Sequence, residues 1–477
     1  MALMELKTKR YNISVDQLVE GGPGGYESVY LTSEGEPASA ELYELLSEFS
    51  GELLPVVNGS IRQRNGIALL NALNRKDSIG IASGFKPSGA YHFGHKLTSS
   101  AVSFFQKNGA QIFIPVADIE CSMDPRMTKE QYEFWAADNL LDWGANGVNL
   151  DAAHVYLQSE EHRVNQLAYL VARSLNFEFA ADIYGMDKLV SDFPFLFAGI
   201  TQVGDILLPQ HTEFGNDHSF MVSGQDQDGH MKMTVALVEE SLKNSIVLPG
   251  VRTVPSGFYI PHIRGIRGNK ASSSKPQDTL YLGSGPAQED LDARINSTLK
   301  KFDDACKEDK ENLEKCALDM VRYIDVFEKA SNVEFRNLYK DDLYINELVN
   351  KLDAAKPEEK KVVQEQLDHY LISICKDMHQ NNIELVRDLL PQALSEHQMK
   401  RQAVLDYAKL KPSIVKVQAQ ESLGQGWGQF HESSSNSEDP NLPEFWKVPK
   451  NAIVDKNKRN PTDWYTLVNK VANKLMP

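Results

Sequence analysis

The chain has 477 residues, 42% hydrophobic and 24% charged, which predicts two or three domains of an ordinary globular protein. No run of about 18 apolar residues occurs, so the sequence excludes a membrane-spanning helix. The net charge of −16 argues against non-specific binding to nucleic acid, but it leaves room for a local basic face.

Cysteine usage and the N-terminus indicate a compartment. The four cysteines lack metal-ligand spacing, and residues 1–7 contain neither a secretory apolar core nor an Arg-rich transit pattern. We therefore expect reduced thiols, a cytoplasmic protein and no membrane association.

Residues 1–60 are predicted to form an N-terminal extension that includes a helix over 40–49. Arg62 and Arg64 follow, and the apolar run at 67–73 predicts a second helix. Solvated arginines beside a helix that caps the next domain are one interpretation of this stretch.

The stretch from Gly84 to His95 is the strongest signal in the sequence. It follows a short apolar run at 78–82 that predicts a buried strand, and its glycines and proline predict a turn before a helix over 96–105. A helix N-terminus after such a turn favours an anion. Two imidazoles at i, i+3, His92 and His95, could donate to phosphate oxygens; a metal pair or two unrelated histidines are the alternatives.

Apolar segments alternate with helical patterns from about 75 to 285, which predicts a parallel sheet. Further strands are expected at 111–118 and 155–157. Asp118 and Glu120 would then lie at a strand end, where ligands of such sheets bind. Two helix caps are also predicted, a capping box of Thr128 with Gln131 and a cap at Ser159.

Two later segments place polar residues where a ligand site is expected. In the helical pattern at 199–207, Gln202 and Asp205 are three residues apart among apolar neighbours, and a buried carboxylate needs a partner. A ligand could supply it, or the residue could be a helix cap or part of an internal ion pair. At 222–234 a strand is predicted to end at Ser223–Gly224 and a helix to begin near His230, with Asp226 and Gln227 at the turn.

Together these motifs resemble the class I aminoacyl-tRNA synthetases. The run at 87–95 is similar to the first signature of that class, and the run at 270–274 resembles its second, the Lys-Met-Ser-Lys-Ser loop. Ala271 replaces the usual Met and Ser273 the usual Lys. The Asp-Gln-Asp form at 226–228 resembles the tryptophanyl group of the tryptophanyl and tyrosyl branch, whose archaeal and eukaryotic members also carry an Arg-rich approach to the first signature.

The resemblance implies an α/β catalytic domain with a Rossmann-like parallel sheet, followed by a C-terminal α-helical domain. It assigns 61–285 to the catalytic domain, 286–417 to a helical anticodon-binding domain and 418–477 to a linker and tail. In the helical domain, the basic residues between His397 and Lys416 are candidates for a phosphate-contacting stripe, although a solvated helix face is the favoured interpretation of each. The tail could pack on the body or touch tRNA.

The resemblance also implies site roles. The residues expected to act in catalysis are His92, His95, Lys270, Ser272, Ser273 and Ser274. Those expected to contact ATP are Gly84, Pro87, Ser88, Gly94, Asp226 and Lys275, where Lys275 could replace the lysine missing at 273. Those expected to contact the amino acid are Glu120, Gln202, Asp205 and Gln227. Mg²⁺ would be held by the ATP phosphates rather than by a protein metal site.

The implied reaction activates L-tryptophan with ATP and transfers it to its tRNA, in an enzyme that is typically a homodimer. Tyrosine is the near alternative, because Asp205 could accept either the indole N–H or the phenol O–H. Ala82 stands where relatives usually have a tyrosine, and this widening of the pocket favours the larger indole. A binding protein or a nucleotidylyltransferase on the same fold is the distant alternative.

Overall fold

The computed structural model describes residues 62–185, 193–260, 279–283, 391–412, 441–459 and 463–475, with short stretches at 36–37 and 271–272 and a few single positions. The chain divides into two compact units. One comprises 1–27, 263–280 and 291–395, and most of it lies outside the described residues. The other comprises 28–262, 281–290 and 396–477, and it holds the sheet.

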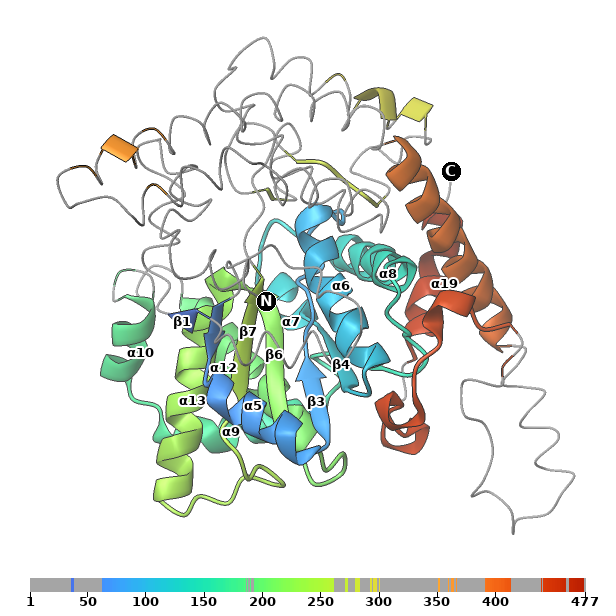
Figure 1. Cartoon of the computed structure of the whole chain (residues 1–477). Helices are drawn as coiled ribbons and strands as arrows, with labels where there is room; N and C mark the ends of the chain where they lie inside the picture. Colours follow the sequence, from blue (N-terminus) through green and yellow to red (C-terminus); the bar gives the residue numbers. More distant parts are fainter. Residues whose placement is uncertain are drawn as a thin grey trace, which may run out of the picture. The chain divides into compact units, whose positions relative to one another are not determined.

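A seven-stranded sheet in the order β1-β2-β7-β6-β3-β4-β5 forms the centre of this second unit (Figure 1). Five neighbouring strands, β7 to β5, run parallel to one another, and β2 and β1 continue the sheet antiparallel beyond β7. The strands are β1 Glu36–Pro37, β2 Arg62–Arg64, β3 Ile79–Ala82, β4 Gln111–Val116, β5 His154–Leu157, β6 His218–Gly224 and β7 Ser256–Ile260. The predicted Rossmann-like parallel sheet is confirmed.

Helices connect the parallel strands, as right-handed crossovers require. They are α5 Gly66–Arg75, α6 Phe93–Lys107, α7 Asp118–Ser122, α8 Lys129–Ala145, α9 His162–Val171, α10 Phe177–Tyr184, α12 Phe193–Leu207 and α13 Asp228–Lys243. A core of fully buried aliphatic side chains joins α9, α12 and α13, including Leu167, Val203 and Leu237. Gly204 lies so close to α9 that a Cβ there would be 2.4 Å from the Val164 carbonyl oxygen.

Most predicted elements are found within a few residues of their expected bounds. The capping box of Thr128 and Gln131 is present at the start of α8. The predicted cap at Ser159 is wrong: Glu161 caps α9, whereas the Ser159 amide and hydroxyl both donate to the Asp118 carboxylate, at 3.1 and 2.5 Å. Ser159 therefore ties the end of β5 to the start of α7. The helix expected over 40–49 lies outside the described residues.

The basic residues expected to form a stripe on the C-terminal helix are mostly buried instead. Helical residues 396–412 pack in the second unit, where Arg401 is 1% exposed between Asp138 and Asp142 of α8. His397 contacts Asp142, and Lys411 pairs with Asp151. Both expectations, a phosphate stripe and a solvated face, are wrong for these three residues, because each side chain is buried and faces a buried carboxylate. Lys409 is exposed, and Lys416 lies outside the described residues.

The C-terminal tail packs against the body of the second unit. It contains three 3-10 turns, η5 Glu444–Trp446, η6 Lys450–Ala452 and η7 Lys456–Lys458, and the helix α19 Trp464–Leu475, which lies beside α8 in Figure 1. Trp446 is fully buried; its indole N–H donates to the Gly144 carbonyl at 2.8 Å. Of the two expectations for the tail, packing on the body is observed for these residues.

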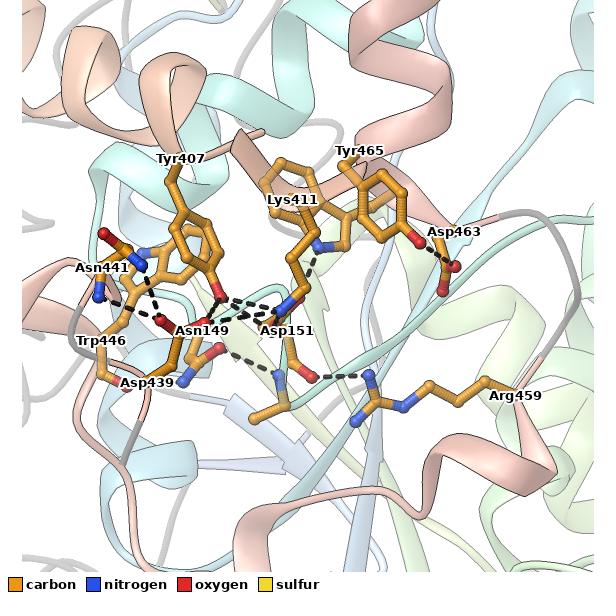
Figure 2. Close-up of polar contacts among 12 residues, drawn as sticks. Asn149, Asp151, Tyr407, Lys411, Asp439, Asn441, Trp446, Arg459, Asp463 and Tyr465 are labelled. Carbon is orange, nitrogen blue, oxygen red and sulfur yellow. Dashed lines mark hydrogen bonds and ion pairs between the residues drawn. The ribbon is translucent and has the colours of Figure 1, made fainter. Parts of the chain in front are cut away.

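Asp151 is the anchor of this contact (Figure 2). Its carboxylate accepts from Lys411, from the Tyr407 hydroxyl at 3.0 Å and from the Trp464 indole at 3.3 Å, while its carbonyl accepts from Arg459 at 2.5 Å. One buried residue thus joins the turn before β5, the C-terminal helix and the tail. The cations around it lower the pKa of Asp151 although burial opposes the shift.

Candidate active site

The strand order reverses between β3 and β6, and this switch point locates the candidate site. β3 is followed in the chain by a crossover to β4 on one side, and β6 pairs with β3 on the other. Ligands of open parallel sheets bind at the carboxyl ends of the strands where the order reverses. The first-signature turn follows β3, and the segment Gln225–Gln227 follows β6 as the 3-10 turn η3. Both sequence motifs therefore reach the same edge of the sheet.

His92 and His95 lie together at the N-terminus of α6. His92 is the N-cap, and its Nδ1 accepts the Gly94 N–H at 3.0 Å, while its own amide approaches Nδ1 of His95 at 3.5 Å. The two rings stack with centroids 3.8 Å apart. Because Nδ1 of His92 accepts a hydrogen bond, the neutral ring carries its proton on Nε2. The expected same-sided pair on the first helical turn is present, and the ring stack holds both imidazoles at the helix end that favours anions.

Gly84 is required by the packing between β3 and β4. A Cβ at this position would lie 1.9 Å from the Pro115 carbonyl oxygen, and the same oxygen accepts the Phe85 N–H at 3.1 Å. In the rest of the turn, Pro87 is buried and Ser88 is exposed. The glycine thus has a structural role whether or not ATP contacts it.

Glu120, expected to contact the amino acid, forms an ion pair with Lys86 at 3.1 Å. Both side chains are partly exposed, at 40% and 31%. The sequence analysis missed Lys86 as a site residue, although its place inside the signature turn was a usable signal. The pair brings a cation to the end of β4, next to the turn that carries the histidines.

The structure brings together Gln202 and Gln227, two residues that the sequence analysis expects to contact the amino acid. The Gln202 Nε2 in α12 donates to Oε1 of Gln227 at 3.0 Å, and both residues are partly exposed. Asp226, beside Gln227, is exposed. The helix after this turn, α13, begins at Asp228, two residues before the expected start.

Asp205 is buried and takes its partners from the protein. Its Oδ1 accepts the Tyr156 hydroxyl at 2.9 Å, and its Oδ2 accepts Nε2 of Gln158 at 2.6 Å. Burial raises the pKa of Asp205 to about 7, although both hydrogen bonds oppose the shift. The interpretation as an ion pair or a cap is wrong, because both partners are neutral donors from β5 and the residue after it. Nothing local in the sequence marked Tyr156 or Gln158 as partners.

Arg64 joins the antiparallel strand β2 to the second motif. Its guanidinium binds both carboxylate oxygens of Asp228, at 2.8 and 2.6 Å, where α13 begins. The hydrogen bond to Asp228 raises the pKa of Arg64. The interpretation of Arg64 as a solvated residue is therefore wrong, while the side chain of Arg62 lies outside the described residues.

The second signature is described only at Ala271 and Ser272. The Ser272 amide donates to the Thr279 hydroxyl at 3.0 Å, and that hydroxyl donates to the Ser272 carbonyl at 2.7 Å. Lys270, Ser273, Ser274 and Lys275 lie outside the described residues. Within the described ranges, no group of three His, Cys, Asp or Glu side chains is arranged to hold a metal ion, and every helix is too short or too polar to cross a membrane.

Comparison with known proteins agrees with this geometry. A family model described as "tRNA synthetases class I (W and Y)" matches residues 74–371. The tryptophan–tRNA ligase of Methanocaldococcus jannaschii is 32% identical over 218 residues, which is 45% of this chain and 57% of the relative. That of Methanopyrus kandleri is 30% identical over 223 residues, 46% and 57% respectively. The chain thus spans little more than half the length of these curated relatives.

Solved structures show the same fold. The tryptophanyl-tRNA synthetase of Aeropyrum pernix superposes with a TM-score of 0.50 at 22% identity, over 79% of this chain and 95% of that one. The enzyme of Encephalitozoon cuniculi, bound to tryptophan, gives 0.51 at 14% identity, over 79% and 96%. At these identities the likeness concerns the fold alone.

Proposed function

Since the chain belongs to the class I tRNA synthetases of the W and Y type, we propose that it activates L-tryptophan with ATP and transfers it to the 3′ end of its tRNA. One observation carries the proposal: the stacked His92 and His95 and the Gln202–Gln227 pair flank the same switch point. The first pair suits a nucleotide phosphate and the second an ammonium group. The names of the relatives support tryptophan as the amino acid.

In the first step the tryptophan carboxylate attacks the α-phosphorus of ATP in line, and pyrophosphate leaves. Such a reaction needs positioning and charge stabilisation rather than a protein nucleophile. Nε2–H of His92 and the ring of His95 would donate to phosphate oxygens, and the N-terminus of α6 adds its dipole. Mg²⁺ would neutralise the phosphates and would be carried by them, a mode that needs no protein cage.

The amino acid would bind beside α12. Gln202 and Gln227 present amide oxygens that can accept from the ammonium group, and Glu120 lies at the neighbouring strand end. Asp205 already accepts from Tyr156 on one carboxylate oxygen and from Gln158 on the other, and it would accept the indole N–H with a remaining lone pair of the same carboxylate. Recognition of the ring by Asp205 therefore couples to these two side chains.

The second signature would act on the leaving group. We expect Lys270, with Ser272, Ser273, Ser274 and Lys275, to close over the pyrophosphate, so that Lys270→Ala lowers the rate of activation more than the affinity for tryptophan. The second step passes the aminoacyl group to the tRNA hydroxyl without a covalent enzyme intermediate.

The proposed assembly is a cytoplasmic homodimer. Three aromatic side chains of neighbouring helices are exposed: Tyr169 at 73%, Phe177 at 45% and Phe197 at 54%. Aromatic side chains are enriched at protein interfaces, which supports a contact with a second copy here. Light scattering on purified protein would give twice the chain mass of 53.5 kDa if the proposal holds.

The decisive experiment is ATP–pyrophosphate exchange with single amino acids. Exchange that depends on tryptophan, and is at least about 100-fold weaker with tyrosine, supports the proposal. A preference for tyrosine would change the substrate but keep the ligase. No exchange with any amino acid would contradict the proposed function and favour a binding protein on this fold.

A further inference from the structure

Tyr91, the residue before His92, connects the first signature to distant parts of the second unit. Its side chain is fully buried, and its hydroxyl forms a short hydrogen bond with Ser99 in α6. Its carbonyl accepts the Leu282 and Gly283 amides at 3.0 and 3.2 Å. The Tyr91 side chain is therefore held in one position by the residues packed around it.

Four aromatic rings follow one another from the C-terminal helix to the candidate catalytic pair. The His397 ring lies parallel to Tyr91, within 8°, with centroids 6.1 Å apart. Tyr91 lies 5.5 Å from His95, and His95 stacks on His92 at 3.8 Å. These separations are within the range of direct ring contact. A shift of the His397 ring would therefore move Tyr91 against His95.

The His397 ring is itself held in place by α8. Its Nε2 lies 2.9 Å from Oδ1 of Asp142, and Arg401, one turn further along the helix, contacts the same carboxylate. All three side chains are at most 3% exposed. A buried carboxylate held by two partners has little freedom, so it fixes the ring that it contacts.

Helix α8 also forms hydrogen bonds directly with the first signature, on either side of the two histidines in the chain. Asn139 donates to the Gly89 carbonyl at 3.2 Å, and Asn146 donates to the Lys96 carbonyl at 2.9 Å. Asn139, Asp142 and Asn146 follow one face of the helix at spacings of three and four residues. The same face thus contacts the residues before and after the histidines and, through Asp142, the C-terminal helix.

We propose that His397 is a positioning residue for the first signature: oriented by Asp142, its ring sets Tyr91 and, through Tyr91, the orientation of His95 and His92. His397 does not touch substrate. The inference rests on the proposed function for its effect on rate, but its effect on the two rings stands independently. This role makes the C-terminal helix part of the structure that positions the candidate catalytic histidines, although more than 300 residues of chain separate His397 from Tyr91.

Two substitutions separate the ring of His397 from its hydrogen bond. His397→Gln keeps a donor for Asp142 but removes the ring, and His397→Phe keeps a ring but removes the donor. We expect the Gln variant to lower kcat for tryptophan-dependent exchange about tenfold, with KM for tryptophan within about twofold, because misplacement of a catalytic group costs rate. The Phe variant keeps a ring against Tyr91 but loses its orientation by Asp142, so it should lose less kcat than the Gln variant. A purely structural role predicts the opposite order, since His397→Phe would leave the buried Asp142 carboxylate without one of its two partners.

The matched control is Lys411→Met, which removes a different buried partner of a carboxylate from the same helix, where Lys411 pairs with Asp151. It should lower the melting temperature without changing kcat. An equal loss of kcat in Lys411→Met and His397→Gln would overturn the inference, because helix stability would then explain both. Unchanged kcat in His397→Gln would overturn it as well.

A second measurement does not depend on activity. In ¹³C-labelled histidine spectra, assigned with His92→Gln and His95→Gln, we expect His397→Gln to shift the His92 and His95 ring signals. The signal of His218, at the amino end of β6, should stay in place. Unmoved His92 and His95 signals would refute the positioning role even in an active enzyme. Shifted signals in a protein without exchange would uphold it while the proposed function fails.

Discussion

In the proposed site, His92 would combine two roles in one imidazole. Its Nδ1 accepts from Gly94 at the start of α6, so one nitrogen caps the helix, and we propose the Nε2–H of the same ring as a donor to phosphate. A side chain that only donated to ligand would be easier to replace without structural cost. The cap explains why the ring is held before any substrate arrives.

We predict that His95→Ala lowers pyrophosphate exchange by 100-fold or more, about 3 kcal/mol, with the melting temperature nearly unchanged. His92→Ala should lose exchange to a similar extent and also stability, on the order of 1 kcal/mol, because it removes the N-cap. Steady-state exchange and thermal unfolding measure the two effects. Near-normal exchange in both variants would remove the histidines from the mechanism.

Asp205 should make stability depend on pH. Its pKa of about 7 in the folded protein is above its ordinary value near 3.9, so the folded state binds the proton more tightly. The stabilisation is complete below about pH 4 and is lost as the pH rises through 7, by a few kcal/mol. Asp205→Asn cannot ionise, and its urea unfolding free energy should therefore fall less than that of the wild type between pH 4.5 and 7.5. The same dependence of the unfolding free energy on pH in both proteins would contradict a raised pKa of Asp205.

At the scale of elements, close contacts between strand ends and helices shape the site. β3 and β4 approach at Gly84, and α9 and α12 approach at Gly204, in each case because no Cβ intervenes. The contact at Gly84 sets where the signature turn leaves the sheet. The pair of Ser159 with Asp118 ties the next strand end to α7 in the same way.

Gly84→Ala should therefore destabilise the protein rather than only weaken ATP binding. The new Cβ would meet the Pro115 carbonyl oxygen, which is backbone and cannot swing away, and we expect a cost of about 1–3 kcal/mol. Denaturant unfolding measures it. Ser88→Ala, in the same turn but exposed, is the control and should leave stability unchanged. Equal stability of the Gly84 variant would show that the turn can move.

At the scale of the whole second unit, the C-terminal residues complete the body that carries the site. The helix 396–412 reaches Asp138 and Asp142 of α8, and the tail covers the region around Asp151 (Figure 2). Segments more than 250 residues apart in the chain thus share buried partners.

Trp446→Ala should show how much the tail contributes. The indole is fully buried and its N–H is bonded to Gly144, so its loss should cost about 3–5 kcal/mol. Thermal and denaturant unfolding measure this loss. Lys447→Ala, at the next and exposed position, is the control. A tail that unfolds separately, without lowering the main transition, would contradict its role in the body.

The sequence alone determined the local features of this protein. The strand before the signature, the capping box of α8 and the helix that carries Gln202 depend on residues close together in the chain, and periodicity and turn residues report those directly. The motifs at 84–95 and 226–227 were found because glycines, histidines and amides recur there in an interpretable order. Their meeting at one edge of the sheet followed from the expected parallel topology.

Only the tertiary structure decided which distant groups are partners. Asp205 is held by Tyr156 and Gln158, Arg64 by Asp228, and Arg401 by Asp138 and Asp142. From the sequence, each of these residues was compatible with a ligand, a solvated surface or an internal contact. The free energy that chooses among these depends on burial and on the distance to a counter-group, and both arise only when segments far apart in the chain are packed together.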